Sequence, residues 1–155
     1  MKIRIRNGRV IDPVSRENSV RDVFVDQGFI VDPRAAGADF PADHEIDASG
    51  CIVCPGLVDL QARLRDPGEE HKATMQSELS AAIAGGITSV CVPPDTNPVI
   101  DTPAMVHMVR QRGRRIQKAR IYPLGALTVG LAGEQLTDMA ALRDAGCTAV
   151  SNANR

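Results

Sequence analysis

The sequence predicts an α/β fold in which a small strand-rich part, residues 1–50, precedes a βα repeat over residues 51–155. Two observations predict it. Short runs that alternate apolar with polar residues fill the first part, whereas continuous apolar runs alternate with segments of helical composition in the second. Strands linked by helices build a parallel sheet or an (αβ) barrel, because a helical crossover is how parallel strands connect.

The first fifty residues are predicted to form half-buried antiparallel strands. Ile3-Arg4-Ile5-Arg6 and Val23-Phe24-Val25 carry the alternating pattern. Turn signals separate the strands at Asn7-Gly8, Asp12-Pro13, Gln27-Gly28 and Asp32-Pro33. We expect this subdomain to be part of a composite β-sandwich.

The second part is predicted to contain three helices, each with its own start and stop signals. Thr74 can cap the first, which ends at Gly85-Gly86. Asp101-Thr102 precedes Pro103 at the start of the second, which Gly113 ends. The third starts near Glu134 and stops at Gly146. The apolar faces comprise Met105, Val106, Met108 and Val109 in the second helix, and Leu136, Met139 and Ala140 in the third.

Four apolar runs are the predicted parallel strands: Cys51 to Leu60, Ile87 to Val92, Ile121 to Leu127 and Cys147 to Val150. They supply three full βα units and a fourth strand, whereas a closed eight-stranded barrel needs roughly 250 residues. The pattern predicts the N-terminal part of a longer protein or a truncated product, with Ser151 to Arg155 opening a loop. Alone, such a half-barrel is expected to associate or aggregate because one sheet edge is unpaired.

Composition excludes several functional classes. A formal charge of -1 argues against a nucleic-acid or membrane-surface binder, and three Phe, one Tyr and no Trp disfavour stacking platforms for bases. The N-terminus alternates charged and apolar residues, and no apolar run approaches about 18 residues. We therefore expect a cytoplasmic protein.

Several conspicuous residues are predicted to be structural. Cys51-x-x-Cys54 lies in an apolar run without a second ligand pair, so buried thiols are expected rather than a zinc or redox motif. His44, His71 and His107 are isolated and are expected on the surface. The glycines at 85–86 and 130–133 lack phosphate-loop spacing. Six cations between Arg110 and Arg120 favour a solvated helix end, with a protein-partner patch as the alternative.

One stretch carries a family resemblance. Pro55 to Gly68, read as PGLVDLQARLRDPG, resembles the first barrel strand of dihydroorotases in the amidohydrolase superfamily, whose pattern is P-G-x-[IV]-D-x-H-x-H-x-R-x-P-G. Ala84 to Thr88, Pro94 to Pro98, Gly125 to Thr128 and Asp144 to Ser151 resemble later motifs of the same family. The resemblance implies the N-terminal part of a metallo-dependent-hydrolase (TIM-type) barrel, with residues 51–155 as its first half.

The resemblance places the metal ligands on residues unsuited to zinc. In the family the H-x-H histidines hold Zn²⁺, which acidifies a water for hydrolysis of a cyclic amide. Here those positions hold Gln61 and Arg63, and the later aspartate position holds Asn152. Glutamine is a weak zinc ligand, and the guanidinium of arginine stays protonated. We therefore expect no catalytic residues, no metal and no cofactor.

The substrate-binding positions match unevenly. Arg65 matches the family arginine that grips the substrate carboxylate, and Asn97 lies in a matched loop. Asp95, however, stands where the family has asparagine, and its charge would repel that carboxylate. We hypothesise that Asp95 pairs with Arg63 or Arg65 across neighbouring strand ends.

The resemblance implies a dihydroorotase-like protein of pyrimidine biosynthesis, similar to the inactive homologues that serve aspartate transcarbamoylase as a scaffold. The expected role is a non-catalytic subunit that stabilises this partner. The alternatives are an active dihydroorotase or related zinc cyclic amidase with ligands on later strands, and a metal-free sensor that binds an anionic metabolite through Arg63 and Arg65.

Overall fold

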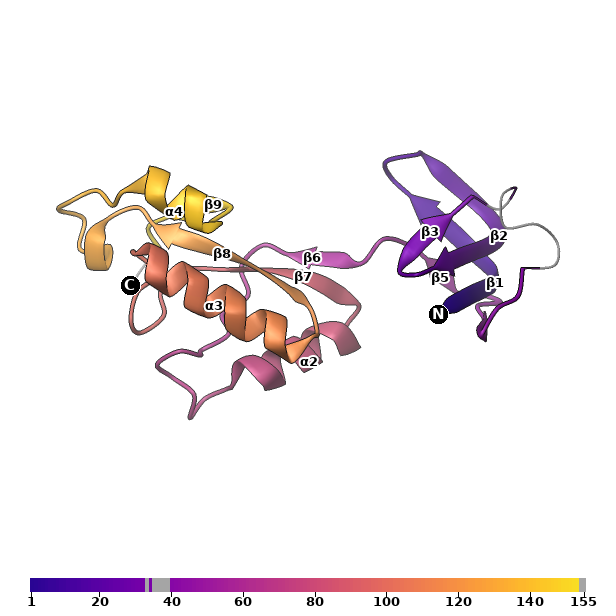
Figure 1. Ribbon diagram of the computed structural model, residues 1–155, viewed down its shortest axis with the longest axis horizontal. Helices are drawn as coiled ribbons and strands as arrows, with labels where there is room; N and C mark the ends of the chain where they lie inside the picture. The colour runs from indigo at the N-terminus through magenta and orange to yellow at the C-terminus, as the bar shows by residue number, and fades with distance from the viewer. Residues whose placement is uncertain (33, 35–39, 154–155) are drawn as a thin grey trace. The chain divides into compact units, whose positions relative to one another are not determined.

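The computed structural model describes residues 1–32, 34 and 40–153. The chain forms two compact units, Met1–Pro55 and Gly56–Arg155, which are described separately (Figure 1). Along the described ranges, no helix is long and apolar enough to cross a membrane.

The first unit is a five-stranded sheet with the order β3-β2-β1-β4, in which β5 also pairs with β1. Its strands are β1 (Lys2–Asp12), β2 (Glu17–Asp26), β3 (Phe29–Val31), β4 (His44–Asp47) and β5 (Ile52–Val53). The β1–β2 and β2–β3 pairs are antiparallel, as expected. Both β4 and β5 pair with β1 in parallel, because the chain leaves β3 at one edge of the sheet and returns on the far side of β1. The antiparallel pairing expected for the two alternating runs is therefore confirmed, and the parallel pairing of β4 and β5 was not anticipated.

Asn7-Gly8 is a bulge inside β1 and not the turn that the sequence predicts. The register with β2 shifts between Ile5 and Gly8, and Asn7 adopts a φ of 60°. A Cβ at Gly8 would lie 2.5 Å from Cγ2 of Val53. The absence of a side chain at this position therefore leaves room for Val53 of β5. The turn signals at Asp12-Pro13 and Gln27-Gly28 do connect consecutive strands. Pro33, like residues 154 and 155 of the expected C-terminal loop, lies outside the described residues.

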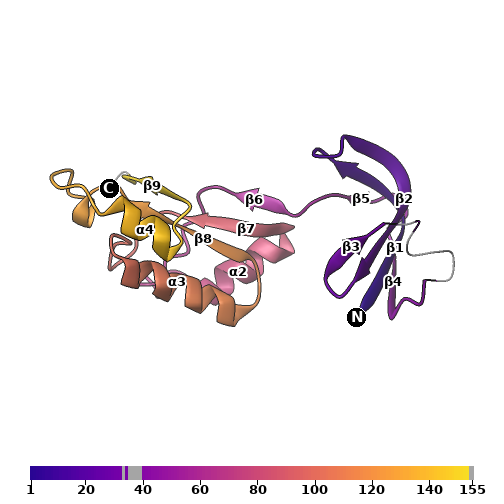
Figure 2. The same ribbon diagram turned by 45° about the horizontal axis from the view of Figure 1, so that its top comes forward.

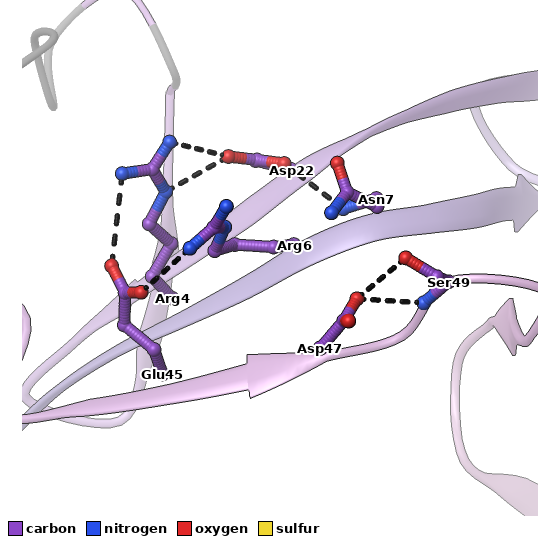
Figure 3. Close-up of polar contacts among 7 residues, drawn as sticks. All are labelled: Arg4, Arg6, Asn7, Asp22, Glu45, Asp47 and Ser49. Atoms are coloured by element: carbon purple, nitrogen blue, oxygen red, sulfur yellow. Dashed lines mark hydrogen bonds and ion pairs between the residues drawn. The ribbon is translucent and has the colours of Figure 1, made fainter.

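Ion pairs between side chains connect β1 with both of its neighbours, β2 and β4 (Figure 3). Arg4 Nη2 lies 2.7 Å from Asp22 Oδ2, and Arg6 Nη1 lies 3.1 Å from Glu45 Oε2. The backbone N–H of Asn7 in the bulge donates to Asp22 at 3.1 Å. Arg4 and Arg6, the basic residues of the alternating run in β1, are thus paired with carboxylates on neighbouring strands. Pairs of opposite charge across strands stabilise a sheet.

We expect the first unit to lose stability as the pH falls from about 4.5 towards about 2. The Arg21 guanidinium, and then the Ser19 hydroxyl, lower the pKa of Glu17 from 4.5 to about 2. The Asn7 N–H and then Arg4 lower the pKa of Asp22. A carboxyl group whose pKa is lower in the folded chain stabilises the fold above its unfolded pKa, and this contribution disappears as the pH falls through the folded pKa.

Urea unfolding followed by circular dichroism across this pH range measures the effect. Glu17→Gln is the matched variant, because it removes the titrating group and keeps the side-chain length. Its stability is expected to fall less steeply than that of the wild type between pH 4.5 and 2. Equal slopes for the two proteins would contradict the assignment to Glu17.

The second unit is a curled sheet of four parallel strands in the order β6-β7-β8-β9. The helices α2, α3 and α4 lie on one side of it (Figure 2). The strands are β6 (Leu57–Asp59), β7 (Ile87–Val92), β8 (Arg120–Ala126) and β9 (Ala149–Ser151), and the helices are α2 (Met75–Ala84), α3 (Pro103–Ile116) and α4 (Met139–Ala145), with a 3₁₀ turn η1 (Val129–Leu131). This order is the one expected for consecutive βα units of a partial barrel.

The hydrophobic core of the second unit lies between this sheet and its helices. Leu79 of α2, Val106 of α3 and Leu142 of α4 are completely buried and belong to one cluster with Val90 and Val92 of β7. The cluster joins all three helices to the sheet. A common core therefore holds the ends of the parallel strands in place.

The first two helices differ in how well their ends were predicted. Thr74 caps α2 and accepts a hydrogen bond from the N–H of Ser77, as expected. The apolar stripe of α3 is also confirmed, since Val106 and Val109 are buried. Gly113, however, does not end α3, which continues to Ile116. A Cβ at Gly113 would lie 2.5 Å from Cδ1 of Ile121, so the glycine allows the helix to approach β8.

The third helix was predicted with the wrong start and the wrong face. It begins at Met139 because Asp138 caps it, accepting from the N–H of Ala141 at 2.9 Å. Leu136 is 61% exposed, and Met139 and Ala140 are also exposed. Leu136 forms an isolated antiparallel bridge with Thr128, which keeps its segment out of the helix. The buried helical residues are Leu142 and Ala145.

The apolar run from Cys51 to Leu60 is not one buried strand. It divides into β5, which belongs to the first unit, and β6, which belongs to the second, with Pro55-Gly56 between them. Cys51 and Cys54 are exposed, so the expectation of buried thiols is wrong for this pair. Cys147 is half-buried, and burial raises the pKa of its thiol to about 11. His44, His71 and His107 are exposed, as expected.

Candidate functional site

The predicted site residues gather at the carboxyl ends of the parallel strands. Gln61, Arg63 and Arg65 follow β6, Asp95 and Asn97 follow β7, and Asn152 follows β9. Because the four strands are parallel and adjacent, these segments emerge at the same edge of the sheet. In α/β barrels the active site is built at this edge.

Gln61 and Arg63 lie beyond the end of β6, which stops at Asp59, and not within a strand as the resemblance suggested. The segment nevertheless stays beside β7, because the N–H of Ala62 donates to the carbonyl of Cys91 at 2.9 Å. Ala62 and Leu64 pack against the core. Gln61, Arg63 and Arg65 alternate with them along the chain and are exposed.

The ion pair hypothesised for Asp95 is present. Arg63 Nε lies 2.9 Å from Asp95 Oδ2, and the two residues come from the ends of neighbouring strands. The Asp95 side chain is 16% exposed and that of Arg63 is 39% exposed. A partly buried pair with one well-shielded carboxylate is screened less by solvent than a surface pair. The negative charge of Asp95 is therefore neutralised within the chain.

Arg65 also has an internal partner. Its Nη1 lies 3.0 Å from Oε2 of Glu69, which in turn pairs with Lys72. The ammonium of Lys72, and then the guanidinium of Arg65, lower the pKa of Glu69. Arg65 has a φ of 62°, an unusual value for a residue with a side chain. Glu69 thus engages one nitrogen of the guanidinium, and the Arg65 side chain remains 40% exposed.

Asn97 contributes to the contact between two loops. Its backbone N–H donates to the carbonyl of Pro67 at 3.1 Å, and its Cβ lies 2.5 Å from where a Cβ at Gly68 would be. The neighbouring Thr96 is buried, and its hydroxyl donates to the carbonyl of Pro98 at 2.7 Å. The loop after β7 is thus fitted against the loop that carries Arg65.

Asn152 accepts a hydrogen bond on Oδ1, which is the atom that would have to bind a metal ion. The hydroxyl of Thr128 donates to Asn152 Oδ1 at 2.9 Å, and accepts from the N–H of Gly133 at 3.1 Å. Thr128 is buried at the end of β8, in the segment that resembles the family's G-A-[ILV]-T. The amide of Asn152 thereby joins the ends of β8 and β9.

The residues at the family's metal positions do not fit zinc. Gln61 and Asn152 offer neutral amide oxygens, and the guanidinium of Arg63 has no lone pair to donate. Asp95 is a carboxylate, but it is paired with Arg63. Across residues 1–32, 34 and 40–153, no three side chains of His, Cys, Asp or Glu gather closely enough to hold a metal ion. A dication here would also face the positive charge of Arg63.

The gap between Arg63, Arg65 and Asp95 is small. Arg63, Arg65 and Asp95 line a cavity of about 10 Å³, together with Glu69 and Thr96. Ligand pockets usually measure roughly 300–1,000 Å³, and about 10–15 Å³ holds one water molecule. The gap that Arg63, Arg65 and Asp95 share is therefore too small for an organic substrate, whereas a second cavity, of about 360 Å³, borders Gln61 and Arg63.

Three residues that complete this site were not identified from the sequence. Glu69 pairs with Arg65, and the hydroxyl of Thr128 donates a hydrogen bond to Asn152. Asp66 accepts from the N–H of Met75 at the start of α2 and pairs with Arg112 of α3. Glu69 carries no sequence signal. Asp66 and Thr128 lie within matched motifs, but their partners could not be read from the sequence because each contact depends on how the loops at the strand ends are folded.

Comparisons with known proteins agree on one family. Residues 50–155 match the family described as dihydro-orotase-like. A dihydroorotase-like protein from Pseudomonas aeruginosa is 49% identical over 152 residues, which cover 98% of this chain and 36% of the relative. A protein from Pelobacter propionicus named dihydroorotase is 45% identical over 156 residues, which cover 100% of this chain and 37% of the relative. The chain thus spans little more than a third of the length of these curated relatives.

Solved structures share the fold at low sequence identity. The L-hydantoinase (dihydropyrimidinase) from Arthrobacter aurescens superposes with a TM-score of 0.79 at 23% identity, over 96% of this chain and 32% of that chain. A crystal structure of a dihydroorotase has a TM-score of 0.61 at 14% identity, over 96% and 41% of the two chains. These likenesses show that the fold is part of a barrel like that of the solved amidohydrolases. The family match over residues 50–155, with the relative at 49% identity, shows that the chain belongs to the dihydroorotase-like family.

Proposed function

We propose that this chain belongs to a non-catalytic dihydroorotase-like subunit of pyrimidine biosynthesis, whose role is to stabilise aspartate transcarbamoylase. The observation that carries the proposal is the ion pair of Arg63 with Asp95, which occupies the strand ends where the family's first metal ligands would lie. Gln61 and Asn152 at the other ligand positions support it, because amides bind zinc poorly. The likeness to a protein named only dihydroorotase-like is consistent with this role.

The first test measures zinc content and hydrolysis of dihydroorotate to carbamoyl aspartate by the purified protein. We expect less than stoichiometric zinc and no turnover above the uncatalysed rate. Stoichiometric zinc with turnover would overturn the proposal in favour of an active dihydroorotase, the name carried by the relative from Pelobacter propionicus.

The second test addresses the partner. Co-expression with aspartate transcarbamoylase from the same organism, followed by size-exclusion chromatography, is expected to yield a complex in which the transcarbamoylase withstands heating better than it does alone. Separate elution with unchanged thermal inactivation would contradict the stabilising role, whatever the zinc content is.

Restoring the two histidines alone is not expected to restore hydrolysis. In the double variant Gln61→His, Arg63→His the side chain of Asn152 still holds an amide, and Asp95 still places a negative charge where substrate carboxylate would bind. The matched comparison adds Asn152→Asp and Asp95→Asn to the same background. Zinc binding and dihydroorotate hydrolysis are measured for both, and turnover by the double variant would show that these two positions are not limiting.

A further inference from the structure

A cavity at the opposite end of the parallel sheet is lined by cations. It measures about 390 Å³ and lies between the last turns of α3 and the start of β8. Arg110, Arg114, Lys118 and Arg120 are among its lining residues. The candidate site above lies at the carboxyl ends of the strands, whereas Arg120 is the first residue of β8, so the two sites are separate.

Three of these cations lack a carboxylate partner among the residues that the structure describes. Arg114, Lys118 and Arg120 form no ion pair there, in contrast to Arg112, which pairs with Asp66. The sequence has no Asp or Glu between Asp101 and Glu134. The chain as a whole carries a formal charge of only -1, so this concentration of positive charge is local.

Arg110 is already engaged and shapes one wall of the cavity. Its Nη1 donates to the carbonyl of Ala145 at the end of α4 at 2.7 Å, and its guanidinium packs where a Cβ at Gly146 would be. This contact fixes α3 against α4 and leaves the other three cations for a ligand. The cluster is thus anchored on one side by a packed arginine.

The helix dipole does not account for the remaining charge. The C-terminus of a helix carries roughly half a negative charge, which one nearby cation offsets. Arg115, which does not line the cavity, and Arg114 both lie in the last turn of α3. Lys118 and Arg120 follow the helix and add two further positive charges.

We propose that this cavity binds an inorganic polyphosphate. Arginine guanidinium groups bind phosphate oxygens through paired hydrogen bonds, and a lysine adds a point charge. Three unpaired cations match the charge of a di- or triphosphate better than that of a monoanion. The volume lies in the range of small-molecule pockets.

Isothermal titration calorimetry of the 155-residue chain with pyrophosphate tests the proposal. We expect saturable binding that the double variant Arg114→Gln, Lys118→Gln weakens by about tenfold or more. Arg114→Gln alone should weaken binding more than about twofold. Its matched control, Arg115→Gln, removes one charge from the same turn of α3 outside the cavity and should change the affinity less than about twofold. Inorganic phosphate is expected to bind more weakly than pyrophosphate.

Three results would overturn the proposal. One is no binding of pyrophosphate by a chain whose circular dichroism shows that it is folded. Another is equal weakening by Arg115→Gln, which would indicate a diffuse electrostatic effect. The third is binding of poly-glutamate without binding of pyrophosphate, which would identify a surface for an acidic protein partner instead.

Discussion

Replacing Gly68 by alanine is expected to destabilise the second unit by about 2 to 5 kcal/mol. Gly68 has a φ of 108°, a conformation that a residue with a Cβ rarely adopts. The added Cβ would also collide with the backbone carbonyl of Asn97 and lie 2.5 Å from its Cβ. Because the obstacle includes backbone, the loops that carry Arg65 and Asp95 would have to separate.

The matched control for this variant is Gly133→Ala. Gly133 also has a positive φ, 80°, but a Cβ there would meet nothing within 4 Å. The control therefore measures the backbone strain alone, which is about 1 kcal/mol. Urea unfolding followed by circular dichroism compares the two variants. Equal losses of stability would contradict a steric role for the contact between Gly68 and Asn97.

Leu142→Ala is expected to cost about 2 to 5 kcal/mol of stability. Leu142 is completely buried in the cluster that α2, α3 and α4 share with the sheet, so its truncation leaves a cavity under α4. The control is Leu136→Ala, since Leu136 is 61% exposed in the segment before the same helix. Its effect should stay within about 0.5 kcal/mol.

Thermal unfolding of the two leucine variants separates them directly. A similar melting temperature for both would show that the helix buries Leu136, as the sequence pattern alone predicted. A large shift for Leu142→Ala only would support the observed start of α4 at Met139.

Elements with local signals were predicted well. The strand from Ile87 to Val92 and the cap at Thr74 depend on residues within one turn or one run of the chain, and both are found where expected. The pairing of Arg63 with Asp95 was also foreseeable, because consecutive βα units place their strand ends side by side.

The wrong or missing predictions involve contacts that form outside a single helix or strand. Leu136 has the spacing of a helical apolar position, but its bridge with Thr128 holds it in an extended segment. Gly113 resembles a helix stop, yet it is a point of close contact with Ile121. The pairing of Arg65 with Glu69 was not anticipated, because it depends on a turn in which Arg65 has a positive φ. Periodicity contains no information on such contacts.

The ion pair of Arg63 and Asp95 has a consequence for how this lineage can evolve. Returning Arg63 to histidine by itself removes the cation beside a carboxylate that is only 16% exposed, and changing Asp95 by itself leaves the guanidinium without its partner. Each single substitution towards the family's metal ligands therefore loses stability before any catalytic benefit arises. Under the non-catalytic role proposed above, the ion pair would make a metal site hard to acquire by one mutation at a time.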